Sequence, residues 1–172
     1  MNNNYKSFVF EWLNPNCEAE IMQAIGCEHV CFPPHEACSS EHMRMRIKQA
    51  SPYFMVAKEK ATKQIVAILN GICTNETKFR DSFFTDASLH QEQAENIMLT
   101  GLAVLPAYQN QGIAKAMMAF YAQAMRQKAK KALLLTCLAS KVKMYEHFGF
   151  VDLGIANSTW GNEVWHEMIK TL

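Results

Sequence analysis

The chain has 172 residues, of which 49% are apolar and 19% charged, a composition typical of a globular protein with a core of its own. Its formal net charge is +1, so bulk electrostatics indicate neither a nucleic-acid nor an acidic-membrane partner. No apolar window of about 18 residues and no apolar signal core are present. We therefore expect one cytoplasmic domain over residues 1–172.

Hydrophobic patterning in the first 73 residues predicts both strands and helices. An alternating aromatic segment at 5–12 is typical of a strand. Asn14 and Pro15 fit the cap and the first position of a helix that ends near Cys27. The other elements predicted here are a helix capped by Ser39 or Ser40 and running to 48, and a hairpin of strands 53–58 and 64–73.

Residues 75–95 form a long polar segment with an aromatic cluster and no clear period, for which we expect a loop; a lid over the substrate is one interpretation of it. Residues 97–105 are nearly all apolar, as in a central strand buried on both faces. The remaining predicted elements are a helix at 112–128, a strand at 132–137, a helix at 141–148 ending at Gly149, and a hairpin of 150–155 and 160–168. Together they predict a mixed sheet flanked by helices.

The segment 99–118 is the most informative part of the chain. A buried strand stops at Pro106, and a turn containing Gly112 leads into a helix. The first N–H groups of a helix have no intrahelical partner, and the helix dipole favours an anion beside them. Positions 112 and 114 carry no side chain or a single methyl group, so a diphosphate can approach the backbone closely. The pattern predicts a phosphate-binding turn.

The six cysteines are interpreted as reduced thiols, because no export signal is present. Cys27 and Cys31 lie four residues apart and, with His29 or His35, suggest a metal site. No CxxC pair or second pair with ligand spacing accompanies them. We therefore expect buried or incidental thiols and no metal.

Two motifs resemble the GCN5-related N-acetyltransferase (GNAT) family. Its acetyl-coenzyme A motif, (Arg/Gln)-x-x-Gly-x-(Gly/Ala), is matched by Gln109, Gly112 and Ala114. The segment Tyr145-Glu-His-Phe-Gly-Phe150 is similar to the family's (Leu/Phe)-Tyr-x-x-x-Gly-Phe signature, with methionine before the tyrosine. The resemblance implies an α/β GNAT fold, with a mixed, mostly antiparallel sheet of about seven strands and about four helices. It also implies acetyl-CoA-dependent N-acetyltransferase activity.

Within the family, the chain resembles most the arylalkylamine (serotonin-type) branch. The segment 28–38 is similar to that branch's Cys-Phe-Pro loop, which covers the amine site. The segment 154–168 is similar to its C-terminal hairpin and puts Trp165 at a substrate-facing position. This resemblance implies a small arylalkylamine acceptor that attacks acetyl-CoA directly in a ternary complex.

The family also implies how acetyl-CoA is bound. In the family, the pantetheine amides of acetyl-CoA pair with the strand that precedes the turn, and the diphosphate of acetyl-CoA binds the turn itself. The predicted cofactor-binding residues are Leu102, Ala103, Val104, Gln109, Asn110, Gln111, Gly112, Ile113 and Ala114.

For catalysis, the resemblance makes Tyr145 the general acid for the thiolate, and a phenol with a pKa near ~10 suits a thiol of ~8.5. The branch's two catalytic histidines are replaced here by Met98 and Thr100, neither of which can act as a base. Glu95, at the start of the same strand, is the predicted base through a water chain, ahead of His90 and Glu92.

We expect the amine pocket to be aromatic, because aromatic faces suit an aryl ring or an organic cation. Its predicted residues are Phe32, Pro33 and Pro34, the aromatic cluster at Phe83 and Phe84, Met98 and Trp165.

Other acceptors stay open: a polyamine, an aminoglycoside or a protein N-terminus. Strongly cationic substrates favour an acidic pocket, but the acidic residues near these motifs are dispersed along the sequence. They are Glu36, Glu41, Asp81, Asp86, Glu92 and Glu95. The absent histidine pair also leaves open a non-catalytic acyl-CoA-binding domain. The sequence is compatible with a monomer or a homodimer.

Overall fold

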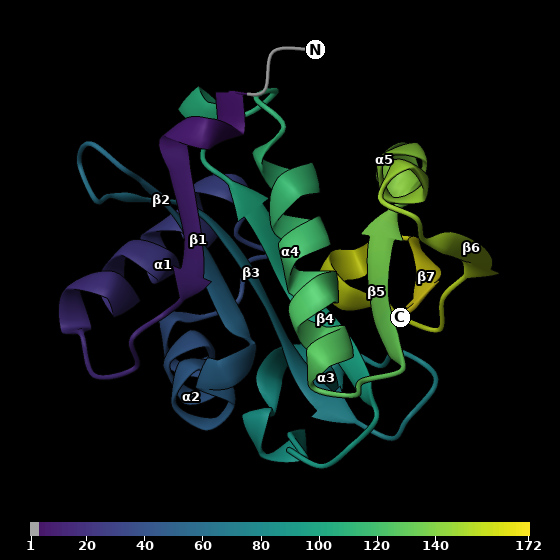
Figure 1. Cartoon of the computed structure of the whole chain (residues 1–172). Coiled ribbons are helices and arrows are strands. Elements are labelled where there is room, and N and C mark those ends of the chain that lie inside the picture. Colours follow the sequence, from purple (N-terminus) through teal and green to yellow (C-terminus); the bar gives the residue numbers. More distant parts are fainter. Residues whose placement is uncertain (1–3) are drawn as a thin grey trace.

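A computed structural model describes residues 4–172, which are built on one seven-stranded sheet (Figure 1). In spatial order the strands are β1 (Phe8–Trp12), β2 (Phe54–Glu59), β3 (Ile65–Thr74), β4 (Asn96–Val104), β5 (Ala132–Leu138), β7 (Trp165–Thr171) and β6 (Val151–Ile155). All neighbours are antiparallel except β4 and β5, which are parallel. The predicted mixed, mostly antiparallel sheet is confirmed.

Helices cover both faces of this sheet. They are α1 (Glu18–Cys31), α2 (Ser40–Ala50), α3 (Ser82–Thr85), α4 (Ile113–Gln127) and α5 (Val142–His147). Helices α1 and α2 lie across the opposite face from α4 (Figure 1). Alternate strand residues point to opposite faces. Val56 therefore packs in the core of α1 and α2, while Met55 packs in the core of α4.

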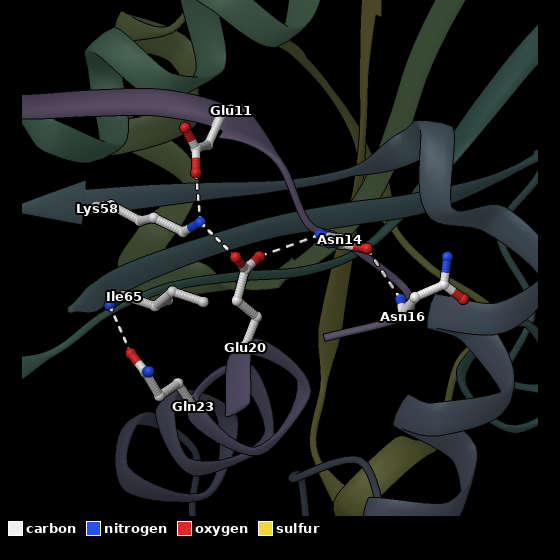
Figure 2. Close-up of polar contacts among 7 residues, drawn as sticks. All are labelled: Glu11, Asn14, Asn16, Glu20, Gln23, Lys58 and Ile65. Atoms are coloured by element: carbon white, nitrogen blue, oxygen red, sulfur yellow. Dashed lines mark hydrogen bonds and ion pairs between the residues drawn. The ribbon is translucent and has the colours of Figure 1, made fainter. Parts of the chain in front are cut away.

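The helix start predicted at Asn14 and Pro15 is wrong, because α1 begins at Glu18 with Cys17 as its N-cap. The Asn14 side chain instead accepts a hydrogen bond from the backbone N–H of Asn16 (3.0 Å), which makes a local turn (Figure 2). The helix also continues one turn beyond the predicted end, to Cys31. The cap predicted at Ser39 is confirmed, since its hydroxyl accepts from the N–H of His42.

Polar contacts tie the N-terminal half of α1 to the strands (Figure 2). Lys58 on β2 pairs with Glu11 on β1 and with Glu20 on α1, the latter at 2.8 Å. The Gln23 side chain accepts from the backbone N–H of Ile65 at the start of β3 (2.8 Å). These contacts fix how α1 crosses the sheet and therefore where its C-terminal turn lies.

Three other predicted segments differ from the structure. The first strand starts at Phe8, after a 3₁₀ turn at Asn4–Ser7, and the last starts at Trp165, after a 3₁₀ turn at Trp160–Asn162. The predicted lid at 75–95 is packed in place: Phe83 is fully buried, and the N–H of Phe79 donates to Glu167 on β7 (2.6 Å). Across residues 4–172, no helix has the length and apolar character needed to cross a membrane.

Strands β4 and β5 separate after a short paired stretch. They pair only over Asn96–Met98 and Ala132–Leu134. Farther on, β4 pairs with β3 alone and β5 with β7 alone. Thr100 is an extra residue in β4, because Asn70 faces Gly101 and the next residue, Gly71, faces Leu99. Such bulges bend a strand and are common beside active sites.

Candidate active site

A cavity of about 700 Å³ lies where β4 and β5 have separated. It is lined by Leu99–Val104 of β4 and Leu135–Leu138 of β5. The start of α4 and Tyr145 of α5 line it at what we call the α4 side. The end of α1, the following turn and the two tryptophans of the C-terminal hairpin line the α1 side. The cavity therefore has walls from elements on both faces of the sheet.

The α4 side carries positive potential. Gly112 is the N-cap of α4 with φ +82°, a left-handed conformation that glycine adopts without strain. A Cβ there would meet nothing within 4 Å, so the backbone faces open space. The N–H groups of the first helical turn lack intrahelical partners, and Lys115 of this turn and Lys141, just before α5, also line the cavity. This arrangement suits an anion.

Of the predicted cofactor-binding residues, eight line the cavity and one does not. Those that line it are Leu102, Ala103, Val104, Gln109, Asn110, Gly112, Ile113 and Ala114. The side chain of Gln109 donates to the carbonyl of Val104 (2.9 Å), which joins the turn to β4. Gln111 is absent from the lining, because its side chain turns back to the carbonyl of Ala107 (3.3 Å).

Tyr145 reaches the cavity from α5. Its ring is buried edge-to-face against Phe148 and Phe150, with centroids 5.9 and 5.6 Å away. Burial, and to a smaller extent nearby Cys137, raises the pKa of the Tyr145 phenol above its usual value. The hydroxyl has no hydrogen-bond partner among residues 4–172. A protonated, unengaged hydroxyl is therefore available to a group in the cavity.

Glu28, which the sequence did not single out, is the main polar group of the α1 side. Its side chain is 3% exposed; Oε1 accepts from the backbone N–H of Cys38 (3.0 Å), and Oε2 has no partner within the described chain. Oε2 lies 3.5 Å from where a Cβ would stand on Gly101 of β4, so it is close to the strand. Burial raises the pKa of Glu28, and the Cys38 hydrogen bond and the charge of Arg46 oppose this rise.

A buried hydrogen-bond network holds this wall in place. Arg46 on α2, 2% exposed, donates to the carbonyl of Phe84 (2.6 Å) and to the side-chain oxygen of Asn70 on β3 (3.1 Å). Thr100, the bulged residue of β4, donates to the same oxygen (2.8 Å). The network thus connects α2, α3 and both strands around the bulge.

Aromatic residues complete the α1 side. Trp160 stacks on Phe84 with a centroid distance of 4.9 Å and an interplanar angle of 35°, and its Nε1 donates to the carbonyl of Glu36 (2.8 Å). Trp165 donates in turn to the carbonyl of Trp160 (2.8 Å). Phe32 and Pro33 line the same wall. The structure therefore brings four of the seven predicted pocket residues to the cavity, namely Phe32, Pro33, Phe84 and Trp165, whereas Pro34 is not part of its lining.

Met98 and Glu95 are not brought to the cavity. Met98 is 0% exposed in the core opposite Leu134, and the Glu95 carboxylate, 54% exposed, pairs with Lys131 (2.7 Å). The reason is their position on β4. Met98 lies within, and Glu95 just before, the stretch in which β4 and β5 are still paired.

Three further predicted residues, His90, Glu92 and Phe83, also lie outside the cavity lining. His90 and Glu92 contact each other (3.2 Å), and Tyr53 donates a hydrogen bond to Glu92 (2.9 Å). Phe83 belongs to the core.

All six cysteines are free thiols. Burial raises the pKa of Cys137, which lines the cavity, to about 12, whereas a hydrogen bond with Cys27 lowers the pKa of Cys31. Within residues 4–172, the one group of three side chains spaced for a metal ion is His35, Glu36 and Glu163. Neither Cys27 nor Cys31 belongs to this group.

Comparisons with known proteins agree with this architecture. The family model described as Acetyltransferase (GNAT) domain matches residues 50–152. The loading GNATL domain of CurA from Lyngbya majuscula is 12% identical with a TM-score of 0.82, covering 95% of this chain and 97% of that one. The GphF GNAT-like decarboxylase, in complex with isobutyryl-CoA, is 14% identical with a TM-score of 0.76, covering 95% and 98%.

The ribosomal-protein-S18-alanine N-acetyltransferase from Escherichia coli is 17% identical with a TM-score of 0.69, covering 95% of this chain and 93% of that one. No curated protein sequence matches significantly. At these identities the solved structures demonstrate a common fold. The family model spans more than half of the chain, and the chain therefore belongs to the GNAT acetyltransferase domain family.

Proposed function

We propose that this protein is an acetyl-CoA-dependent N-acetyltransferase for a small primary amine, with an aryl or alkyl body. The observation that carries the proposal is the charge polarity of the cavity. Lys115, Lys141 and the start of α4 favour a phosphate compound on one side, whereas Glu28 and Glu36 favour a cation on the other. Phe84 and the two tryptophans supply the faces for an apolar body or a cation.

The residues present fit acetyl-CoA. The first-turn N–H groups at 112–114 would hold its diphosphate. Beyond Met98, one edge of β4 has no strand partner within the described chain, so Leu102–Val104 can pair with the pantetheine amides as an added strand would. The isobutyryl-CoA bound to the GphF relative supports an acyl-CoA as cosubstrate.

The chain's own residues then divide the proton transfers between them. The ammonium of the acceptor loses a proton to the Glu28 carboxylate, directly or through one water. The neutral amine attacks the thioester carbon and the C–N bond forms. The nitrogen then loses its second proton to solvent, and cleavage of the C–S bond gives the amide and the thiolate. Tyr145 gives its proton to that thiolate, and exchange with solvent returns Glu28 and Tyr145 to their starting states. Glu28 replaces Glu95 as the proposed base because it lines the cavity.

Other reactions fit the site less well. The substrate of a decarboxylase would bring a carboxylate toward Glu28 and Glu36, and like charges repel. A protein N-terminus is also an amine and is compatible with the carboxylates and aromatic rings of the α1 side. The S18-alanine N-acetyltransferase is a relative named for such an acceptor. A non-catalytic acyl-CoA-binding domain would have no use for an unengaged tyrosine hydroxyl and a buried carboxylate beside the same cavity.

Thiol release from acetyl-CoA tests the proposal. The acceptors are tryptamine, phenethylamine, spermidine and an alanine-starting peptide, and malonyl-CoA is supplied separately to detect decarboxylation. We expect turnover with one or more small amines. Absence of turnover with every amine, combined with tight CoA binding by calorimetry, contradicts the enzyme assignment. Turnover with the peptide alone changes the acceptor class.

A further inference from the structure

The α1 side of the cavity contains two carboxylates, although removal of a proton from one amine requires a single base. Glu28 and Glu36 both line this side. Lysine side chains line the cavity only beside the start of α4 and before α5, at Lys115 and Lys141. A second carboxylate on the acceptor side therefore has no catalytic role in the transfer described above.

Glu36 is a largely desolvated carboxylate held in a fixed position. Its side chain is 11% exposed; its carboxylate lies 3.6 Å from Nε2 of His35 and within 4.8 Å of the Glu163 carboxylate. No lysine or arginine of the described chain is within ion-pair distance of it. The backbone is fixed at both ends, since its N–H donates to the carbonyl of Pro33 (2.9 Å) and its carbonyl accepts from Trp160. Sequestering a carboxylate without a lysine or arginine beside it is costly, which favours a cationic ligand.

A second observation points the same way and is independent of Glu36. Glu28 Oε2 is an acceptor buried against β4 with no partner in the described residues. The stacked rings of Phe84 and Trp160 also line this side of the cavity, and Trp160 is hydrogen-bonded directly to Glu36. This side thus offers two carboxylates together with aromatic faces that suit the methylene or aryl body of a cation.

We propose that the natural acceptor is a diamine or polyamine with an apolar spacer, with the reacting amine at Glu28 and the distal ammonium at Glu36. This inference rests on the proposed function and narrows its substrate class. It makes Glu36 the residue that determines specificity. The sequence could not support this choice, because Glu28 and Glu36 become neighbours of one cavity only when α1 extends to Cys31 and the turn after it folds back under Trp160.

The test compares matched substrates that differ only in the distal charge: para-xylylenediamine against para-methylbenzylamine, and cadaverine against pentylamine. For each pair, kcat/KM is measured for the wild-type enzyme, for Glu36→Gln and for Glu41→Gln. Glu41 is exposed on the first turn of α2, outside the cavity lining, and loses the same charge. We expect the wild type to favour at least one diamine by about tenfold or more, a preference that Glu36→Gln loses and Glu41→Gln keeps.

If the wild-type ratio of kcat/KM for diamine over monoamine is near one in both pairs, and the monoamines are turned over well, this inference is overturned and the proposed function stands. A preference that survives in Glu36→Gln overturns it as well. If no amine is acetylated, the proposed function fails instead. Calorimetric titration of each diamine into the CoA complex then tests Glu36 separately, and equal affinity in wild type and Glu36→Gln overturns the inference.

A divalent cation is the rival occupant of Glu36, because His35 and Glu163 are close to it. Zn²⁺ titration of wild type, Glu36→Gln and Glu163→Gln separates the two. Zn²⁺ binding that both substitutions abolish, with no diamine preference in the wild type, overturns the diamine assignment. Diamine preference that persists in Glu163→Gln and in the presence of a chelator supports it.

Discussion

The Glu28 side chain is buried, and one of its carboxylate oxygens has no hydrogen-bond partner in the described chain. If Glu28 is the base, both properties affect the kinetics. Glu28→Gln keeps the shape but cannot accept a proton, so we expect kcat to fall about a hundredfold or more. Because burial raises the pKa of Glu28, the wild-type rate should climb with pH through a value above the ordinary 4.5. That limb should be missing from the pH–rate profile of Glu28→Gln. A variant with near wild-type kcat removes Glu28 from the reaction.

Glu28→Gln should lower activity but raise the free energy of unfolding at neutral pH. A carboxyl whose folded-state pKa is raised contributes fully to stability below its unfolded pKa, and that contribution is lost as pH rises through the folded value. At neutral pH the wild type therefore bears the cost of a buried carboxylate, which Glu28→Gln removes. We expect the variant to be more stable by about 0.5–2 kcal/mol at neutral pH and no more stable in acid. Urea unfolding at both pH values measures this, and destabilisation at neutral pH contradicts it.

Tyr145 should contribute to the release of the thiol and little to binding. Its raised pKa keeps the phenol protonated throughout the usual assay range, as a proton donor requires. Tyr145→Phe retains the ring contacts with Phe148 and Phe150 and removes only the hydroxyl. We expect kcat to fall by at least about tenfold while the Kd of acetyl-CoA stays close to wild type. An unchanged kcat, measured with Kd by calorimetry, contradicts the assignment.

At the scale of elements, the turn into α4 is where cofactor affinity depends on one position. Gly112→Asp places a carboxylate at the site proposed for the diphosphate, and aspartate tolerates the left-handed backbone better than most residues. We expect acetyl-CoA affinity to fall about a hundredfold or more, with the circular dichroism spectrum unchanged. Gly112→Asn is the matched control, since it has the same size and backbone tolerance without the charge. Equal loss in both variants means that charge is not the cause.

The sequence predicted helices and strands best where neighbouring residues alone determine where an element begins or ends. The apolar run in β4, the glycine before α4 and Gly149 after α5 are local signals, and each marks a boundary of the fold. The end of α1 was predicted one turn too early, since Cys27 and Glu28 near its end are buried by contacts with residues distant in sequence, such as Gly101 of β4. Glu28 was overlooked for the same reason.

The position of Glu95 and Met98 outside the cavity lining has a different origin. Met98 lies on β4 as predicted and Glu95 immediately before it, but where β4 leaves β5 depends on pairing between strands more than 30 residues apart. No local pattern encodes that point. The family resemblance named Phe32 and Trp165, which line the cavity, but the contact of Trp160 with Glu36 was not predicted, since 124 residues separate them.

At the scale of the whole molecule, the cavity has one wall suited to each substrate, so both can be bound together. Initial rates with both substrates varied should therefore give intersecting double-reciprocal lines, as in a ternary complex. An acyl-cysteine route would give parallel lines, and Cys31 is the cavity thiol with a lowered pKa. We expect Cys31→Ala to retain activity. Parallel lines together with an inactive Cys31→Ala contradict direct attack.

The separation of β4 from β5 has a last consequence, for solubility. Proteins usually keep unpaired strand edges at the rim of a sheet and protect them with charge or proline. Here the edge is internal, and from Leu99 to Val104 it carries no charged residue. An extended segment of another chain can bind such an edge as readily as a pantetheine arm does. An acyl-CoA bound along β4 would cover this edge and so reduce its tendency to pair with another chain.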